Sequence, residues 1–278
     1  MHTATYYIDL LLSGITVGSL YALIAIGYTM VYGILRLINF AHGDIFMMAG
    51  FFMVYISASM PMAVAIPVVL IMTVALGLLI ERAAYKPLRS APRMSVMISA
   101  IGVSYLLQNL ATYITGGLAR PYPEIPFLKG TFMLGALKIK IITVVTPLLT
   151  ILLVIALVLF INHTKTGMAM RAVSRDFDTA RLMGIKVNNI ISVTFIIGSL
   201  LAAIGSLPGL RAFVAAVFGG IGSIPGAVVG AFLIGICESV IKGSDWSVFS
   251  DAFTFAILIV VLCVKPTGLF GEKVTDKV

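Results

Sequence analysis

The stretch LLLSGITVGSLYALIAIGYTMVYGI, residues 10 to 34, contains no charged side chain. A helix needs about 20 predominantly apolar residues to cross the hydrocarbon core of a bilayer, so this stretch predicts a transmembrane helix. Gly14, Gly18 and Ala22 follow one another at intervals of four residues, with Ser13 beside them. This spacing puts small side chains on one helix face, where a neighbouring helix can approach closely.

The composition of the whole chain agrees with a membrane protein. Hydrophobic residues make up 60% of the 278 residues and charged residues 11%, and the mean hydropathy is +1.11. A water-soluble domain of this composition would have more apolar surface than its interior could hide. We therefore predict an all-α polytopic membrane protein with about eight transmembrane helices, forming a single transmembrane domain over residues 1–278.

One segment is too short to cross the bilayer. Residues 210 to 218 lie between glycine- and proline-containing breaks at 205–209 and 219–226. A helix rises 1.5 Å per residue, so this segment cannot cover a hydrocarbon core about 30 Å thick. We predict a short re-entrant or half-helix element there, surrounded by protein or by a water-filled cavity.

The net charge of +8 reflects membrane orientation rather than binding of nucleic acid. Lys and Arg gather in short connections beside apolar runs, and such loops stay on the cytoplasmic side of a membrane. This rule makes loops 81–95 and 162–189 cytoplasmic. Loop 116–141 is then external, and its alternating end, Lys138 to Ile141, predicts a short solvated hairpin. The N-terminus is expected outside and the C-terminus in the cytoplasm.

The segment RAVSRDFDTARLMGI, residues 171 to 185, is charged and compatible with a helix, although apolar runs lie on both sides of it. Its basic and acidic side chains alternate with apolar ones, which favours a docking surface for a soluble partner. The alternative is a solvated loop whose positive charge only fixes the topology. The residues assigned to the docking surface are Arg171, Arg175, Asp176, Asp178, Ala180, Arg181 and Gly184.

Two polar or glycine-rich motifs are candidates for a translocation path. In NFAHGD, residues 39 to 44, the polar side chains either line the path or lie at the interface, where Asp44 can cap the following helix. In GGIGSIPG, residues 219 to 226, the glycines either allow close helix packing or form an unwound elbow whose free backbone groups line the path. The candidate path residues are Asn39, His42, Gly219, Gly222, Pro225 and Gly226.

Charged residues are nearly absent from the centres of the predicted spans, where each would cost roughly 2.5 to 3.5 kcal/mol. Glu81 falls near a predicted span end, as do Glu238 and Lys242, which can pair at a spacing of four residues. This pattern argues against a proton-coupled pump, which needs carboxylates along its route. Gln108 and Asn109 are expected to form hydrogen bonds between helices.

Motifs of enzymes and of bound cofactors are missing from the sequence. It contains no G-x-x-x-x-G-K-[ST] nucleotide loop, no H-E-x-x-H zinc motif and no serine elbow in a plausible setting. One His and one Asp in NFAHGD do not make a metal site, and Cys237 and Cys263 are interpreted as small buried hydrophobic residues. We expect no catalytic residue, cofactor or metal in this chain, so an ATP-driven process would need a separate ATPase.

Five segments resemble the permease subunits of branched-chain amino acid ABC transporters. These are NFAHGD (39–44), YKPLRSAPRMS with ISAIGVSYLLQN (85–109), NHTKTGMAMRAVSRDFDTARLMGIKVN (162–188), AFVAAVFGGIGSIPGAVVG (212–230) and KPTGLFGEK (265–273). The resemblance implies an inner-membrane importer with a second homologous permease subunit, two cytoplasmic ATPases that use ATP, and an external binding protein that delivers leucine, isoleucine or valine. It also implies that Ala180 to Gly184, an A-x-x-x-G motif, lies in the loop that couples the permease to the ATPase.

The sequence departs from this family at one place and leaves one competing function. The family has a longer connection after the sixth apolar run, whereas here Gly205-Ser206-Leu207-Pro208 leads directly into the next segment. Related permeases carry urea or amides, so the substrate follows from the resemblance alone. A passive channel or permease for a small neutral solute such as urea or amides is the alternative.

Overall fold

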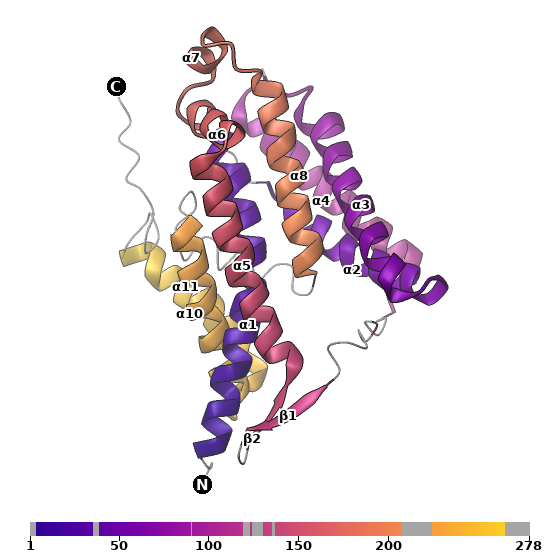
Figure 1. The fold of residues 1–278 in the computed structure, drawn as a ribbon, viewed down its shortest axis with the longest axis vertical. Coiled ribbons are helices and arrows are strands. Elements are labelled where there is room, and N and C mark those ends of the chain that lie inside the picture. Colours follow the sequence, from indigo (N-terminus) through magenta and orange to yellow (C-terminus); the bar gives the residue numbers. More distant parts are fainter. Residues whose placement is uncertain are drawn as a thin grey trace. The chain divides into compact units, whose positions relative to one another are not determined.

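The computed structural model describes residues 4–35, 39–89, 91–118, 123, 130–134, 137–206 and 224–264. Their architecture is helical, as expected, with one short hairpin (Figure 1). Six described helices are long and apolar enough to cross a membrane. They cover Tyr6–Leu35, Met62–Tyr85, Met94–Thr115, Ile141–His163, Val187–Gly205 and Ile224–Lys242. The expected total of eight spans stays a prediction, and the half-helix predicted at 210–218 lies outside the described residues.

The chain divides into two compact units, which are described separately. The first unit comprises Met1–Thr29, Glu124–Leu153 and Leu210–Val278, and the second comprises Met30–Pro123 and Val154–Gly209. The single domain expected over residues 1–278 therefore stays a prediction.

In the first unit, helix α1 (Ala4–Leu35) lies close against α10 (Ile224–Lys242). A Cβ atom added to Gly14 would lie 2.7 Å from the Cα atom of Ile236, and one added to Gly18 would lie 2.8 Å from the Cα atom of Phe232. Only a glycine permits such an approach of two backbones. The close-packing face predicted from the spacing of the α1 glycines is confirmed.

A buried carboxylate also joins α10 to α1. Glu238 is 1% exposed, its Oε2 accepts a hydrogen bond of 2.6 Å from the Tyr21 hydroxyl, and its Oε1 lies 2.5 Å from Nζ of Lys242. The pair predicted between Glu238 and Lys242 is confirmed. Cys237 and Cys263 are exposed rather than buried, because an apolar residue on a membrane helix can face outward as well as inward.

The other described elements of the first unit include a hairpin, two α-helices and a short 3-10 turn. Strands β1 (Thr131–Leu134) and β2 (Leu137–Lys140) pair antiparallel, as the alternation at Lys138 to Ile141 predicted. Helix α5 (Ile141–His163) begins directly after β2 and continues into the second unit. The 3-10 turn η3 (Ser247–Phe249) leads into α11 (Ser250–Val264), which packs against α10.

In the second unit, α2 (His42–Ser59), α3 (Met62–Ile80) and α8 (Val187–Gly205) each pack against the other two. One face of α3 is buried at nearly regular four-residue intervals, at Ala65, Val69, Thr73, Gly77 and Ile80. Its small side chains let α8 approach so closely that a Cβ atom on Gly77 would overlap the Ser199 side chain.

Helix α3 changes to a π-helical turn, η1 (Glu81–Tyr85), at its end. The Lys86 N–H donates to the Glu81 carbonyl over 2.8 Å, a bond that spans five residues instead of four. Helix α4 (Arg93–Thr115) follows and contacts both α2 and η1. The turn and the start of α4 occupy the loop predicted at 81–95.

The charged segment before α8 forms two short helices rather than one. Helix α6 (Lys165–Arg175) and helix α7 (Phe177–Leu182) are separated at Asp176 (Figure 1). The Thr164 hydroxyl accepts a hydrogen bond of 3.0 Å from the Gly167 N–H and caps α6. Both helices contact α8.

Candidate functional site

Helix α6 is strongly two-sided. Its buried face carries Gly167, Met170 and Val173, whereas Arg171 and Arg175 are exposed. The Arg171 guanidinium donates to the side-chain oxygen of Asn162 over 3.2 Å and to its carbonyl over 3.3 Å. The two arginines expected on one helical face are therefore on the outer surface of α6.

Asp176 sets the start of α7. Its carboxylate accepts hydrogen bonds from the N–H groups of Asp178 (2.9 Å) and Thr179 (3.3 Å) and from the Thr179 hydroxyl (2.6 Å). These bonds lower the pKa of the Asp176 carboxyl below its ordinary value, the Thr179 hydroxyl having the largest effect. Asp176 thus divides the helix-compatible segment into two helices, because an aspartate that caps a helix has extended backbone.

The A-x-x-x-G motif has a local structural role at the end of α7. Ala180 is buried, and its carbonyl accepts a hydrogen bond of 3.0 Å from the Ile185 N–H. Gly184 between them has a φ of 81°, a left-handed conformation that glycine adopts without strain. The motif therefore ends the helix and turns the chain toward α8.

The turn exposes apolar and basic side chains together. Leu182 and Met183 are 89% and 79% exposed, and Arg181 lies 3.5 Å from the exposed Asp178. A neighbouring open cavity of about 320 Å³ is lined by Arg181, Ile185, Lys186, Val187, Asn188 and Asn189. Its lining combines two cations and two amides with the apolar side chains of Ile185 and Val187, and none of these residues is acidic.

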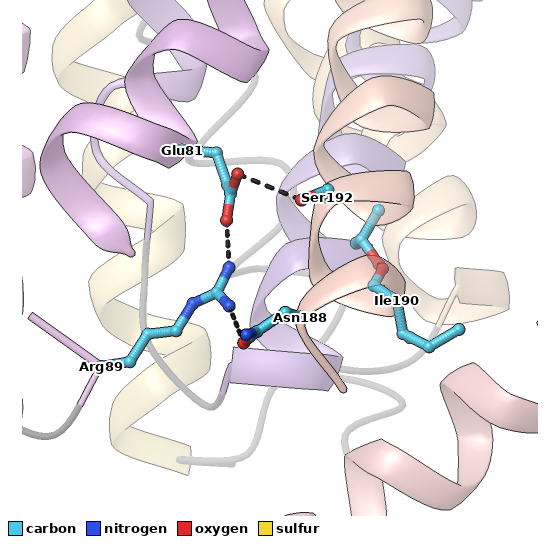
Figure 2. Close-up of polar contacts among 6 residues, drawn as sticks. Glu81, Arg89, Asn188, Ile190 and Ser192 are labelled. Carbon is cyan, nitrogen blue, oxygen red and sulfur yellow. Dashed lines mark hydrogen bonds and ion pairs between the residues drawn. The ribbon is translucent and has the colours of Figure 1, made fainter. Parts of the chain in front are cut away.

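A polar cluster that was not predicted from the sequence joins the end of α3 to the first turns of α8. The cluster consists of Glu81, Arg89, Asn188 and Ser192. Figure 2 shows the Glu81 carboxylate between Ser192 and Arg89, with Arg89 reaching on to the Asn188 side chain. The Glu81 side chain is 1% exposed and the Arg89 side chain 17% exposed.

Partial burial lowers the pKa of the Arg89 guanidinium; Glu81 counteracts this effect, and Arg181 adds to it. Arg89 nevertheless keeps its charge, because a guanidinium is not deprotonated in proteins. Arg181 and Asn188 line the same cavity, so the cluster lies beside the charged turn after α7. A sequence signal for the cluster was present: Glu81 continues the buried four-residue stripe of α3 after Gly77.

In the NFAHGD motif, Asn39 and His42 are each 1% exposed. The Asn39 side-chain oxygen accepts a hydrogen bond of 2.6 Å from the Tyr85 hydroxyl. Its amide nitrogen has no hydrogen-bond partner within the described part of the chain. Two candidate path residues are therefore buried in the second unit, and Asn39 is fixed to η1.

Asp44 does not form a capping bond, one of the two roles open to it, but it lies at the positive end of the α2 dipole, where a carboxylate is favourable. Helix α2 begins at His42 and has no side-chain capping bond at Ala41, so Asp44 lies inside its first turn. Its carboxylate accepts hydrogen bonds from the Ser104 hydroxyl and from the Gln108 amide, the latter over 3.0 Å. The interhelical bond expected of Gln108 is thus confirmed, whereas Asn109 donates to the Tyr105 carbonyl of its own helix over 2.7 Å.

The second group of candidate path residues is described only in part. Pro225 is exposed and Gly226 is buried, both in the first turn of α10 in the first unit. Gly219 and Gly222 lie outside the described residues. The translocation path assembled from the two motifs stays a prediction.

Comparison with known proteins assigns most of the chain to one class. Residues 10–262 match a family model described as the permease component of branched-chain amino acid transport systems. No solved structure matches the chain.

Curated relatives from several organisms are similar over nearly their full length. The high-affinity branched-chain amino acid transport system permease protein BraD of Pseudomonas aeruginosa is 39% identical, over 98% of this chain and 98% of its own. The permease protein LivH of Escherichia coli is 37% identical with the same coverage. A probable LivH protein of Methanocaldococcus jannaschii is 26% identical over 91% of this chain and 89% of its own.

The comparison with BraD extends over 305 positions, more than the 278 residues of this chain. BraD therefore has residues that this chain lacks.

Proposed function

Because the chain belongs to the family of permease components of branched-chain amino acid transport systems, we propose that it forms part of the membrane passage of an importer for leucine, isoleucine and valine. Its partners in this proposal are a second homologous permease subunit, two cytoplasmic ATPases and an external binding protein. ATP is bound by the ATPases, and this chain supplies no catalytic group. The proposed location is the inner membrane, with the N-terminus outside and the C-terminus in the cytoplasm.

The surface formed by α6, α7 and the turn at Gly184 supports docking of an ATPase. Exposed Arg171 and Arg175 lie on α6, and the exposed apolar pair Leu182 and Met183 lies at the end of α7. A pair of large apolar side chains exposed to water favours burial against a protein partner. The basic cavity lined by Arg181 and Lys186 provides charge complementarity for an acidic partner surface.

Transport then follows from closure of the ATPases. ATP binding pulls the docked helices, and the membrane helices pass from an inward-facing to an outward-facing arrangement by rigid-body motion. Asn39, His42, Gly219, Gly222, Pro225 and Gly226 are proposed to line the path. Exposed apolar side chains on α5, such as Leu148, Leu152 and Ile155, suit contact with lipid or with the second permease.

The docking proposal rests on the exposed positive charge of Arg171 and Arg175 on α6. Reversing these two charges tests it. Arg171→Glu with Arg175→Glu should reduce co-purification of the ATPases at least about tenfold, because favourable contacts become repulsive. The matched control is Lys138→Glu with Lys140→Glu, which changes the net charge equally at the hairpin. Unchanged co-purification of the arginine variant, at equal abundance in the membrane, would show that this face is not the docking surface.

A further inference from the structure

A single arginine connects the end of α3 to the first turn of α8. One terminal nitrogen of Arg89 pairs with Glu81, and the other donates to the side-chain oxygen of Asn188 (Figure 2). Asn188 is the second residue of α8. Ser192, one turn further along α8, donates to the second oxygen of Glu81 over 3.1 Å.

The stability of the folded chain is a weak explanation for this cluster. Removing a carboxylate such as Glu81 from water costs several kcal/mol, and its attraction to a partner often only offsets that cost. Apolar side chains of similar volume frequently replace a buried pair without loss of stability. A geometric role accounts better for the arrangement, since both oxygens of Glu81 and both terminal nitrogens of Arg89 are directed to specific partners.

The cluster lies directly beside the proposed docking surface. Four residues after Gly184 the chain reaches Asn188, which also lines the basic cavity next to Arg181. Any displacement of α7 therefore reaches the first turn of α8 through a very short connection. Arg89 holds this turn to the loop after α3.

The π turn η1 also contacts α8 and the candidate path residue Asn39 through Tyr85. Tyr85 packs its ring against Phe195 of α8, with ring centroids 5.2 Å apart, and donates its hydroxyl to Asn39 over 2.6 Å. Extra turns of the π type are frequent at functional positions. Glu81 and Tyr85 are the first and last residues of η1, so the same turn contacts α8 twice and a candidate path residue once.

We propose that Arg89 and Glu81 are positioning residues that bind α3 to the first turn of α8, so that a displacement of the docked helices moves both helices together. This role rests on the proposed coupling to an ATPase. In this proposal the cluster of Glu81, Arg89, Asn188 and Ser192 transmits the movement of the docked helices, and it neither docks the ATPase nor binds the substrate.

Only an arginine at position 89 can bind Glu81 and Asn188 at the same time. A guanidinium is a planar fork that reaches two acceptors at once, whereas an ammonium is a point charge on a flexible stem. Arg89→Lys therefore keeps the charge beside Glu81 and loses the connection to Asn188. Asn188→Ala removes the same connection from the other side and leaves the Glu81 and Arg89 pair in place.

The test uses the complete transporter in proteoliposomes. The binding protein and labelled leucine are on one side of the membrane, and the ATPases are on the opposite side. Leucine uptake and ATP hydrolysis are measured in the same vesicles. Arg89→Lys and Asn188→Ala should each lower uptake per ATP hydrolysed by roughly threefold to tenfold, the effect of losing one hydrogen bond of ordinary net strength, because the bond between Arg89 and Asn188 is exposed to solvent. In Arg89→Lys, whose side chain does not line the basic cavity, co-purified ATPase and basal hydrolysis should stay at the wild-type level. Arg82→Lys, the same change at an exposed position of η1, should leave uptake per ATP unaltered.

A double variant separates transmission from a general structural role. If both residues act through one bond, Arg89→Lys combined with Asn188→Ala should reduce uptake per ATP no further than either change alone. The inference fails if the single variants keep wild-type uptake per ATP, if their effects multiply, or if uptake falls only in proportion to lost complex. Failure of the proposed function is a separate result, since wild-type uptake itself would then not depend on ATP.

Discussion

At the scale of single residues, Asp176 determines the shape of the proposed docking surface. It caps α7 with bonds to two backbone N–H groups and one hydroxyl. Asp176→Ala should remove the cap, fray α7 and reduce ATPase co-purification severalfold. Asp176→Asn is the matched control, because asparagine is an equally good capping residue. Equal loss in both variants would mean that the charge of Asp176, rather than its capping bonds, supports docking.

The same residue gives a pH dependence with a definite sign. Its pKa in the folded chain is below the ordinary value, which is about 3.9 in an unfolded chain. The capping contribution is therefore fully present above about pH 4 and is lost as the pH falls through the lower, folded pKa. ATPase binding should not change through ionisation of Asp176 between about pH 8 and pH 5. A binding step in that range that disappears in Asp176→Asn would contradict this assignment.

Several residues could be placed from the sequence, and others could not. The Glu238 and Lys242 pair followed from a spacing of four residues on one helix. The partners of Asp44 are 60 and 64 residues away along the chain, so no local rule predicts them. Glu81 was placed correctly at a span end, but its burial arises from the approach of α8, which the local sequence of α3 does not specify.

At the scale of elements, close contact between α1 and α10 depends on glycine. Gly18→Ala would place a Cβ atom 2.8 Å from backbone of α10. The backbones must then separate, and the free energy of unfolding should fall by about 1–3 kcal/mol. The midpoint of thermal unfolding in detergent measures the change.

Gly33→Ala provides the control for this prediction, because a Cβ atom at Gly33 has no described neighbour within 4 Å beyond the adjoining backbone of α1. Alanine there should be neutral or should stabilise the helix by about 0.5–1 kcal/mol. If Gly18→Ala and Gly33→Ala have the same midpoint, the glycine face of α1 is not a packing contact.

Periodicity predicted the long helices and the hairpin, but not the breaks between elements. Apolar runs and the alternation before α5 are signals within one segment. The separation of α6 from α7 arises from the capping bonds of Asp176, and the π turn of η1 is coupled to contacts of Glu81 and Tyr85 with distant residues. A periodic pattern reports only local propensity, so it does not predict breaks that depend on contacts with distant residues.

At the scale of the whole molecule, the account separates docking from transmission. Exposed side chains of α6 and α7 form the proposed docking surface. The cluster of Glu81, Arg89, Asn188 and Ser192 joins α8, the helix after α7, to α3. A passive channel needs no coupling to a motor, so neither the docking surface nor the cluster would have a role in it. The alternative of a passive permease for urea or amides therefore makes the opposite prediction about ATP.

Leucine uptake into proteoliposomes tests whether transport through this chain is driven by ATP. The chain is reconstituted with its partner permease, the two ATPases and the binding protein, and labelled leucine is followed with and without ATP. The account predicts accumulation against a concentration gradient that requires both the ATPases and ATP hydrolysis. Uptake that proceeds equally well without the ATPases or without ATP, and stops when the concentrations are equal, would contradict it.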